Sequence, residues 1–346
     1  FRAALQGFLA LHPEHFGRRI PPEEEGIWVA FADLSKVQNG AGESLDDFHI
    51  GFHEGSVSRV AFDDQHGIKT FRYVAEPAST WLQITDSAVD PHDKQQTAAW
   101  LEKLYQSGDA SQKAKAEKTL SSAAYNRDGT LAYEAYDDGP SWCKGKCALF
   151  YLNPDPDVSE PPYASNQASY FWNAQTKETY TTTPGLDGEY IDSFLMAAKL
   201  GNFRRSHFKA ADIPLTFTYD APRAVVTPIL FSTLEFTRWL RPQLPQGKYF
   251  IANSLLIGVP WGAEVFDFMG QEIDWVKQVS GEYRVVPEED WLLSYRRSMS
   301  AKRPYGFLMN TDFANMSKDM VERYMRICLF YGIYPSMFSP NASDAN

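Results

Sequence analysis

The acid with the clearest chemical setting is Asp192, which ends the short apolar segment 188–192 after a glycine turn. Side chains alternate along an extended strand, so Tyr190 and Asp192 should point to the same side. A carboxylate in this position could attack an anomeric carbon as the nucleophile that cleaves a glycosidic acetal. The competing interpretation is structural, because an Asp at a strand–helix junction commonly caps the following helix.

Cleavage of an acetal requires a second carboxyl group, and the segment 266–275 offers candidates. Glu272 follows Gly270 and precedes Trp275. Apolar and aromatic surroundings raise the pKa of an acid, as a proton donor requires. We therefore prefer Glu272 as the acid/base; its competing interpretation is a solvated loop residue. Asp267 is the second choice, because a carboxylate inside an apolar run needs a partner or a role.

Further polar and aromatic residues lie at or after the ends of similar apolar segments. Carboxylates, amides and hydroxyl groups together can donate and accept hydrogen bonds to a polyhydroxylated neutral ligand. Each of these residues has a plain alternative as a loop hydrogen-bonding residue, a surface charge or part of the core. We expect a carbohydrate substrate to be bound by Asp33, Glu76, Asn153, Tyr190, Arg204, Asn253, Trp275, Asn310 and Asp312.

Eight short apolar segments supply these residues, and longer segments with helical patterns lie between many of them. The alternation predicts an α/β protein that forms a single (β/α)₈ TIM barrel with long βα loops. The strands of a parallel barrel are covered on both faces, so near-continuous apolar runs are expected. The predicted strands are 26–33, 67–76, 147–153, 188–192, 248–253, 263–270, 304–310 and 332–338. The predicted helices are 1–20, 95–106 with a second piece to about 124, 222–240, 291–299 and 317–331.

A barrel would also explain how acids far apart in the sequence could meet, because the carboxyl ends of all its strands converge on one mouth. The long stretches 38–67 and 153–184 would then be elaborated loops near that mouth. The structural competitor is an open, doubly wound sheet. Such a sheet usually carries a glycine-rich phosphate loop after its first strand, and no such loop follows Asp33.

The segments 186–193, 250–254 and 265–272 resemble strands four, five and six of a glycoside hydrolase barrel. The plan is similar to that of the α-galactosidase-like and endo-α-N-acetylgalactosaminidase-like families. The resemblance implies that Asp192 is the nucleophile that ends strand four, and that Glu272 or Asp267 is the acid/base. The chain departs from many α-galactosidases in having Tyr190-Ile-Asp192 in place of a Lys-x-Asp motif.

The sequence therefore predicts an O-glycosidase that hydrolyses an oligo- or polysaccharide with two carboxyl groups by a retaining mechanism. The alternative is a non-catalytic carbohydrate-binding barrel, which would keep the aromatic residues but lack a facing acid pair. A third hypothesis is a metal-dependent hydrolase or lyase on the same barrel. We expect no cofactor and no metal, because His49 and His53 lack the helical H-E-x-x-H pattern and the oxygen ligands at 153–157 form a weak calcium motif.

The composition excludes other classes of protein. A formal net charge of −11 argues against a nucleic-acid partner, which requires a basic face. No stretch approaches the roughly 20 apolar residues of a membrane-spanning helix, so we expect no membrane insertion.

The cysteines and the first residues bear on processing and compartment. Cys143 and Cys147 flank a glycine turn and could form a small disulfide loop or remain free thiols, whereas Cys328 has the setting of a core residue. The triplets at Asn315 and Asn341 are compatible with export. We expect residues 1–346 to be one barrel domain from a longer or processed chain, because the sequence opens within a helical pattern at Phe1. As a separate expectation, the protein is secreted or periplasmic.

Overall fold

A computed structural model describes residues 2–36, 45–55, 57–74, 76–254, 262–311 and 315–338. The chain divides into two compact units. The first, here called the barrel unit, comprises Phe1–Val74, Thr179–Ser193 and Leu244–Asn346. The second unit comprises Ala75–Glu178 and Phe194–Gln243, so it is built from the two long connections that follow the third and fourth barrel strands.

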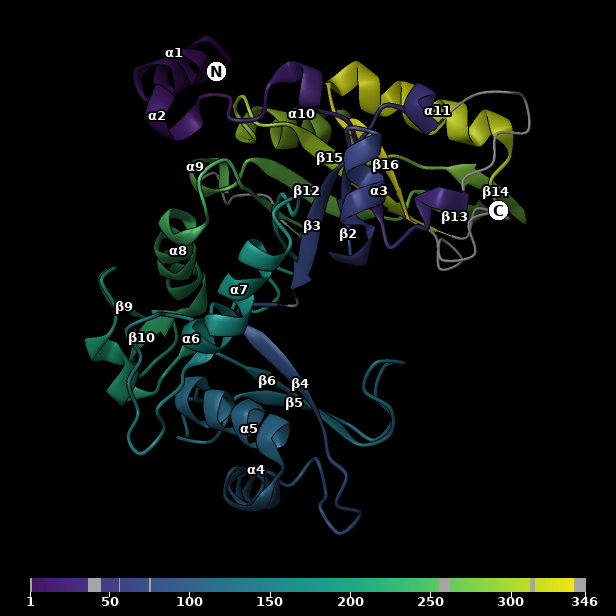
Figure 1. Ribbon diagram of the computed structural model, residues 1–346. Coiled ribbons are helices and arrows are strands. Elements are labelled where there is room, and N and C mark those ends of the chain that lie inside the picture. The colour runs from purple at the N-terminus through teal and green to yellow at the C-terminus, as the bar shows by residue number, and fades with distance from the viewer. Residues whose placement is uncertain are drawn as a thin grey trace. The chain divides into compact units, whose positions relative to one another are not determined.

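Eight parallel strands close the barrel, which confirms the predicted α/β barrel fold. Around the barrel the order is β1-β16-β15-β12-β11-β7-β3-β2; Figure 1 labels five of these strands, β2, β3, β12, β15 and β16. The strands are β1 (Ile27–Ala30), β2 (Ile50–Glu54), β3 (Lys69–Val74), β7 (Gly188–Ile191), β11 (Tyr249–Ala252), β12 (Phe268–Ile273), β15 (Tyr305–Asn310) and β16 (Tyr334–Phe338).

One of the eight predicted barrel strands was wrong, and the bounds of another differ from those in the structure. The segment 147–153 contains β6 (Cys147–Tyr151), which belongs to an antiparallel sheet of the second unit and not to the barrel. Its place in the barrel is taken by β2, whose Gly51, His53 and Glu54 interrupt the apolar pattern. The segment 263–270 is divided between the short helix α9 (Gly262–Val265) and the first part of β12.

Aromatic and aliphatic side chains from successive strands fill the interior of the barrel. Trp28 packs against Tyr190 and Phe268, with ring centroids 5.4 and 6.2 Å apart, and Phe52 lies 4.7 Å from Phe268. Such layers of large side chains make the barrel a packed core and not a pore. Polar groups in this interior are therefore confined to the ends of the strands or must find partners there.

The barrel unit also contains several helices. They are α1 (Arg2–Leu11), α2 (Pro13–Phe16), α3 (Val60–Gln65), α9, α10 (Asp290–Met299) and α11 (Lys318–Tyr331), and the hairpin β13 (Val276–Val279) and β14 (Glu282–Val285) follows β12. The helix α11 begins at the capping Ser317 and ends at Gly332, which has a φ of 69°. It is held to the barrel by the buried Tyr324 hydroxyl, which lies 2.8 and 2.7 Å from the carbonyl oxygens of Phe307 and Ser336.

The second unit has its own sheets and core. The antiparallel sheet β4-β6-β5 is covered on one face by the helices α4 and α5, whose buried Trp100 and Leu120 pack against Leu82 and Phe150. The helix α7 (Ala174–Thr182) has residues in both units. The strands and helices of the second unit are β4 (Ser79–Gln83), α4 (Lys94–Ser107), α5 (Ala110–Ser122), β5 (Tyr133–Tyr136), β6, α6 (Gln167–Phe171), β8 (Gly201–Asn202), β9 (Thr216–Phe217), β10 (Val225–Pro228) and α8 (Ile229–Leu240).

Two observations concern the cysteines and the helices. Cys143 and Cys147 form a disulfide in the second unit, and Cys328 is free and buried, as expected for a core residue. None of the helices in the described residues is both long and apolar enough to cross a membrane.

Close packing between β7 and β11 gives a test of the barrel. A Cβ atom at Gly188 would lie 1.9 Å from the backbone carbonyl oxygen of Tyr249, so these strands must separate to admit even an alanine. We expect Gly188→Ala to lower the free energy of unfolding by about 1–3 kcal/mol or more, as measured by urea denaturation. The control is Gly7→Ala, where the added Cβ has open space; equal stability of both variants would contradict the packing.

Candidate active site

Asp192 lies directly after β7, at the carboxyl end of the barrel, and several side chains hold its carboxylate. The Tyr73 hydroxyl donates to Oδ2 over 2.9 Å, and the Ser193 hydroxyl donates to the same oxygen over 3.2 Å. The Tyr190 hydroxyl makes a longer contact of 3.5 Å with Oδ1. Ser193 has a φ of 47°, a left-handed conformation that is unfavourable for a residue with a Cβ and is found most often where function constrains the backbone.

Asn253, which follows β11, joins Asp192 to Glu272. Its side-chain nitrogen donates to Asp192 Oδ1 over 2.8 Å and to Glu272 Oε1 over 2.6 Å. Its side-chain oxygen accepts from the backbone nitrogens of Ser254 and Glu272 over 2.6 and 3.1 Å, which fixes the orientation of the amide. Because both carboxylate oxygens bind the same nitrogen, they lie no farther apart than the sum of the two bonds, 5.4 Å.

Glu272, near the carboxyl end of β12, is the most accessible acid of this group. A second amide donates to it, because Asn310 Nδ2 lies 3.0 Å from Oε2. The side chain is exposed to solvent, yet enough protein surrounds the carboxyl group for burial to be the main cause of its raised pKa. The negative charge of Asp192 raises this pKa further, whereas hydrogen bonds from Asn253 and Asn310 oppose the shift.

Glu54 is a third acid at this end of the barrel, and the sequence analysis did not select it. It ends β2 and is only 2 % exposed. Trp28 Nε1 donates to its Oε2 over 2.7 Å. Burial raises its pKa well above the ordinary value, and the charges of Asp192 and Glu272 add to the shift, against hydrogen bonds from Tyr190 and Trp28. Glu54 could have been found as an acid at the end of a strand. It was missed because β2 was not predicted as a strand.

Asp267, the second choice for the acid/base, does not lie at the mouth. It precedes β12 and so lies at the opposite end of the strand from Glu272, five residues or roughly 16 Å away along an extended chain. Its fully buried carboxylate pairs with Arg19 over 3.2 Å and accepts from the backbone nitrogen of Phe250 over 2.7 Å. The buried carboxylate is therefore held by structural partners at the amino end of β12, and we do not retain Asp267 as a candidate acid/base.

The remaining residues predicted in the barrel unit have varied settings. Asp33 pairs with Arg59 over 2.7 Å and accepts from the Ser35 hydroxyl over 2.6 Å. Trp275 is 3 % exposed, and its ring packs edge-on against Phe307 and Tyr324 at centroid distances of 5.3 and 5.8 Å, so its faces are not open to a ligand. Asp312 and Asn341 lie outside the described residues.

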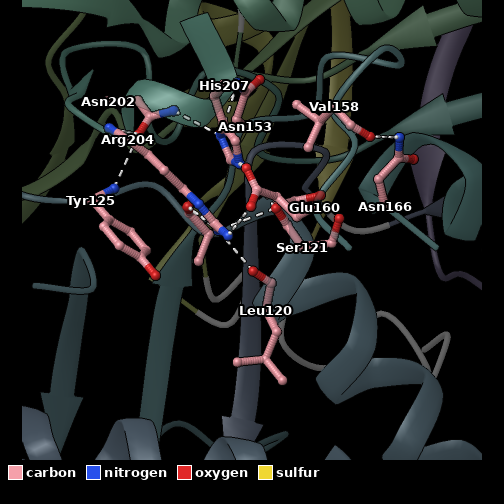
Figure 2. Close-up of polar contacts among 12 residues, drawn as sticks. Leu120, Ser121, Tyr125, Asn153, Val158, Glu160, Asn166, Asn202, Arg204 and His207 are labelled. Atoms are coloured by element: carbon pink, nitrogen blue, oxygen red, sulfur yellow. Dashed lines mark hydrogen bonds and ion pairs between the residues drawn. The ribbon is translucent and has the colours of Figure 1, made fainter. Parts of the chain in front are cut away.

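Glu76, Asn153 and Arg204, which the sequence analysis assigned to the mouth, belong to the second unit. Figure 2 shows Arg204 and Asn153 in a buried polar cluster. Arg204 donates to the backbone oxygens of Leu120 and Ser121 over 2.8 and 3.2 Å, and it pairs with Glu160 over 3.1 Å. These contacts satisfy the end of a helix and give Arg204 a structural role.

His207 completes this cluster as a neutral ring. Its Nε2 lies 3.0 Å from the backbone oxygen of Ser121 and must donate, so Nδ1 accepts from the amides of Asn153 and Asn202 over 3.3 and 3.0 Å (Figure 2). Burial, followed by the charge of Arg204, lowers the pKa of His207 to about 3. Across the described parts of both units, no group of three or more His, Cys, Asp or Glu side chains is arranged to hold a metal ion.

The hydrogen bonds at Glu272 give a test of the site that does not depend on activity. We expect Asn310→Ala to raise the pKa of Glu272, because the lost amide bond favoured the charged form of the carboxyl group. NMR titration of the glutamate carboxyl carbons measures the change. The control Asp274→Asn removes an exposed acid that pairs with Lys277 and should leave the titration of Glu272 in place. A downward shift in Asn310→Ala would contradict the geometry.

Comparison with known proteins gives matches among solved structures alone. No family model matches the chain, and no curated protein sequence matches it significantly. The glycoside hydrolase domain of PelA from Pseudomonas aeruginosa is 13% identical with a TM-score of 0.46, and the match covers 91% of this chain and 94% of that domain. A variant of that domain has the same identity and coverages and a TM-score of 0.44. The cycloalternan-forming enzyme from Listeria monocytogenes, in complex with a pentasaccharide substrate, is 11% identical with a TM-score of 0.44, and the match covers 99% of this chain and 30% of that enzyme.

Proposed function

We propose that the barrel unit hydrolyses O-glycosidic bonds in an oligo- or polysaccharide, with Asp192 as nucleophile and Glu272 as acid/base. The observation that carries the proposal is the shared contact with Asn253, which joins two carboxyl groups from different strands at the mouth of the barrel. Paired carboxyl groups of unequal environment are what cleavage of an acetal requires.

The spacing of the two acids favours retention of the anomeric configuration. Carboxyl groups of retaining glycosidases lie about 5–5.5 Å apart, whereas inverting enzymes leave roughly 6.5–9.5 Å for a water molecule. The bridged oxygens of Asp192 and Glu272 lie within 5.4 Å of each other. This limit refers to one pair of oxygens and is compatible with the spacing of retaining enzymes, so we propose retention.

The two roles follow from the surroundings of the acids. Hydrogen bonds from Tyr73, Ser193 and Asn253 orient the Asp192 carboxylate for attack on the anomeric carbon. The raised pKa of Glu272 keeps a proton on this accessible acid at a higher pH than usual. In the first step Glu272 protonates the leaving oxygen while Asp192 forms a glycosyl ester. In the second, the Glu272 carboxylate takes a proton from water, which attacks the anomeric carbon and releases Asp192.

We propose that the protein is secreted or periplasmic and degrades polysaccharide. The Cys143–Cys147 disulfide supports it, because such bonds persist mainly in oxidising compartments. Of the predicted substrate-binding residues, we retain Asn253, which contacts both acids, and Asn310, which contacts Glu272. We add the half-buried Tyr73 beside Asp192. Tyr190 is 2 % exposed and packs in the barrel interior, so we do not retain it as a substrate-binding residue.

Replacement of the two acids tests the proposal. We expect Asp192→Asn to lower kcat on aryl glycosides by at least roughly 10³-fold, because the attacking carboxylate is lost. Glu272→Gln should lose much activity on natural glycosides, because their leaving groups need a proton. It should lose much less on substrates with acidic leaving groups, which depart without a proton. NMR of the first product should show the anomer of the substrate, as retention requires.

The control for these variants is Asp274→Asn, which changes an exposed acid beside the site and should leave the rates intact. Activity of Asp192→Asn close to that of the wild type would contradict the proposal. Oligosaccharide binding without release from any aryl glycoside would instead favour a non-catalytic carbohydrate-binding barrel.

A further inference from the structure

Phe31 is an aromatic residue at the mouth of the barrel for which the proposed reaction has no assigned use. It follows β1 directly, and the centroid of its ring lies 5.1 Å from that of Tyr73. Tyr73 is the residue whose hydroxyl donates to Asp192 Oδ2 over 2.9 Å. The ring of Phe31 is therefore separated from the proposed nucleophile by a single residue, at the end of the barrel where the acids meet.

The direction of the Phe31 side chain differs from the one that its place in the sequence predicts. Side chains alternate along β1, so Trp28 and Ala30 belong to the interior cluster, whereas Val29 packs in a separate apolar cluster. An extended backbone would turn Phe31 to the side of Val29. Phe31 instead has a φ of 53°, and its ring contacts Tyr73, which packs against the interior cluster.

Two features of Phe31 are unfavourable for the protein alone. A left-handed backbone is strained for a residue with a bulky side chain. The ring is 47 % exposed, so much of its apolar surface stays in water. Gly55, which follows β2, leaves room for this ring, because a Cβ atom there would lie 2.8 Å from Phe31 Cδ1. The chain thus keeps an exposed ring at a strained position, and such positions are most often found where a ligand binds.

The same backbone conformation recurs after two other barrel strands. Ser193 and Ser254 have φ values of 47° and 62°, and each follows the end of its strand by two residues. The Ser193 hydroxyl donates to Asp192, and the backbone nitrogen of Ser254 donates to Asn253. Left-handed residues at strand ends therefore accompany the candidate site, and among these three only Phe31 has an apolar side chain.

We propose that Phe31 binds the apolar C–H face of the sugar ring that Asp192 attacks, so that the substrate is a pyranoside with such a face. The face of an aromatic ring is electron-rich and attracts polarised C–H groups, which a pyranose presents on its ring. The Tyr73 hydroxyl is already engaged with Asp192, so Phe31 supplies the apolar contact beside it. The identity of the attacked sugar rests on the proposed function, whereas binding of a sugar to Phe31 does not.

Kinetics on an aryl pyranoside test the contribution of the ring. Asn tolerates a left-handed backbone, so Phe31→Asn removes the ring and keeps the conformation of the chain. We expect its KM to rise roughly 10-fold while kcat stays within about threefold, because the contact is made before and during the reaction. Phe31→Tyr keeps an aromatic face and should restore KM to within about twofold of the wild type. An unchanged KM in Phe31→Asn, or an equal rise in Phe31→Tyr, would overturn the proposal.

A matched control and a stability measurement separate binding from folding. Phe8 on α1 is 51 % exposed in the same unit, and Phe8→Ala should leave KM and kcat at wild-type values. Phe31→Asn should unfold at a urea concentration no lower than the wild type, because the strain at this position is relieved. Lower stability with an unchanged KM would show a structural role and contradict the proposal. If Phe31→Asn fails to fold, Phe31→Gly removes the ring without strain and takes its place.

Binding can be measured without cleavage. In Asp192→Asn protein with ¹³C-labelled phenylalanine rings, the Phe31 signal is identified by its absence after the further change Phe31→Asn. The probes are the methyl pyranosides of glucose, galactose, N-acetylglucosamine and N-acetylgalactosamine, as both anomers and at millimolar concentration. They carry no aromatic group, so a shift reports contact with the sugar. We expect at least one probe to shift the Phe31 signal and to leave the Phe8 signal in place.

The outcomes distinguish this proposal from the proposed function. Cleavage of glycosides by the wild type, with no probe shifting the Phe31 signal, would overturn the role of Phe31 and leave the hydrolase in place. A shift of the Phe31 signal in a protein whose wild type cleaves no glycoside would support sugar binding at Phe31 and remove the hydrolase. The absence of both would remove both.

Discussion

The amide of Asn253 is the contact on which the candidate site depends. One side-chain nitrogen donates to both Asp192 and Glu272, and the oxygen of the same amide is held by two backbone nitrogens. The backbone nitrogen of Asn253 in turn donates to the carbonyl oxygen of Ile191 over 2.9 Å. The distance between the two acids is therefore set by the register of β11 with its neighbours, in which Ala252 pairs with Ile191 on β7 and Met269 on β12. A slip of one residue in either pairing would turn one acid away from the mouth.

The three acids at the mouth differ in exposure, and this difference lets them coexist. Glu54 is buried among aromatic side chains, Asp192 is partly exposed and Glu272 is open to solvent. Three carboxylates in one small volume would repel each other strongly, and only a distribution of protons relieves that repulsion. The raised pKa values of Glu54 and Glu272 have burial as their main cause and the charge of Asp192 as a further one. Of the three acids, Glu272 is therefore the most open to solvent and Glu54 the least.

Acids at the carboxyl ends of barrel strands could be predicted from the sequence where the strand itself was predicted. Asp192 follows β7 and Glu272 lies near the end of β12, and these two strands flank β11 in the parallel barrel, which brings their carboxyl ends to one mouth. Glu54 was missed because glycine and histidine interrupt the apolar pattern of β2. Asp267 was considered as an acid/base because β12 was expected to begin five residues too early, which placed an acid inside the strand that in fact precedes it.

The second unit explains the other errors. The buried run of β6 has the composition of a barrel strand, and its pairing with β4 and β5 is not encoded in its own residues. Asn153 and Arg204 were therefore expected at the ends of barrel strands, whereas they form part of a buried polar cluster of the second unit (Figure 2). Hydrogen-bond networks such as those of Asn253 and His207 join distant segments, so no local pattern predicts them.

The most direct test of the account is the titration of Glu272 in wild-type protein and in Asp192→Asn, followed by NMR of its carboxyl carbon. If the two acids face each other across one amide, removal of the Asp192 charge must lower the pKa of Glu272. An unchanged titration of Glu272 in a folded Asp192→Asn protein would contradict the pairing on which the proposed chemistry depends.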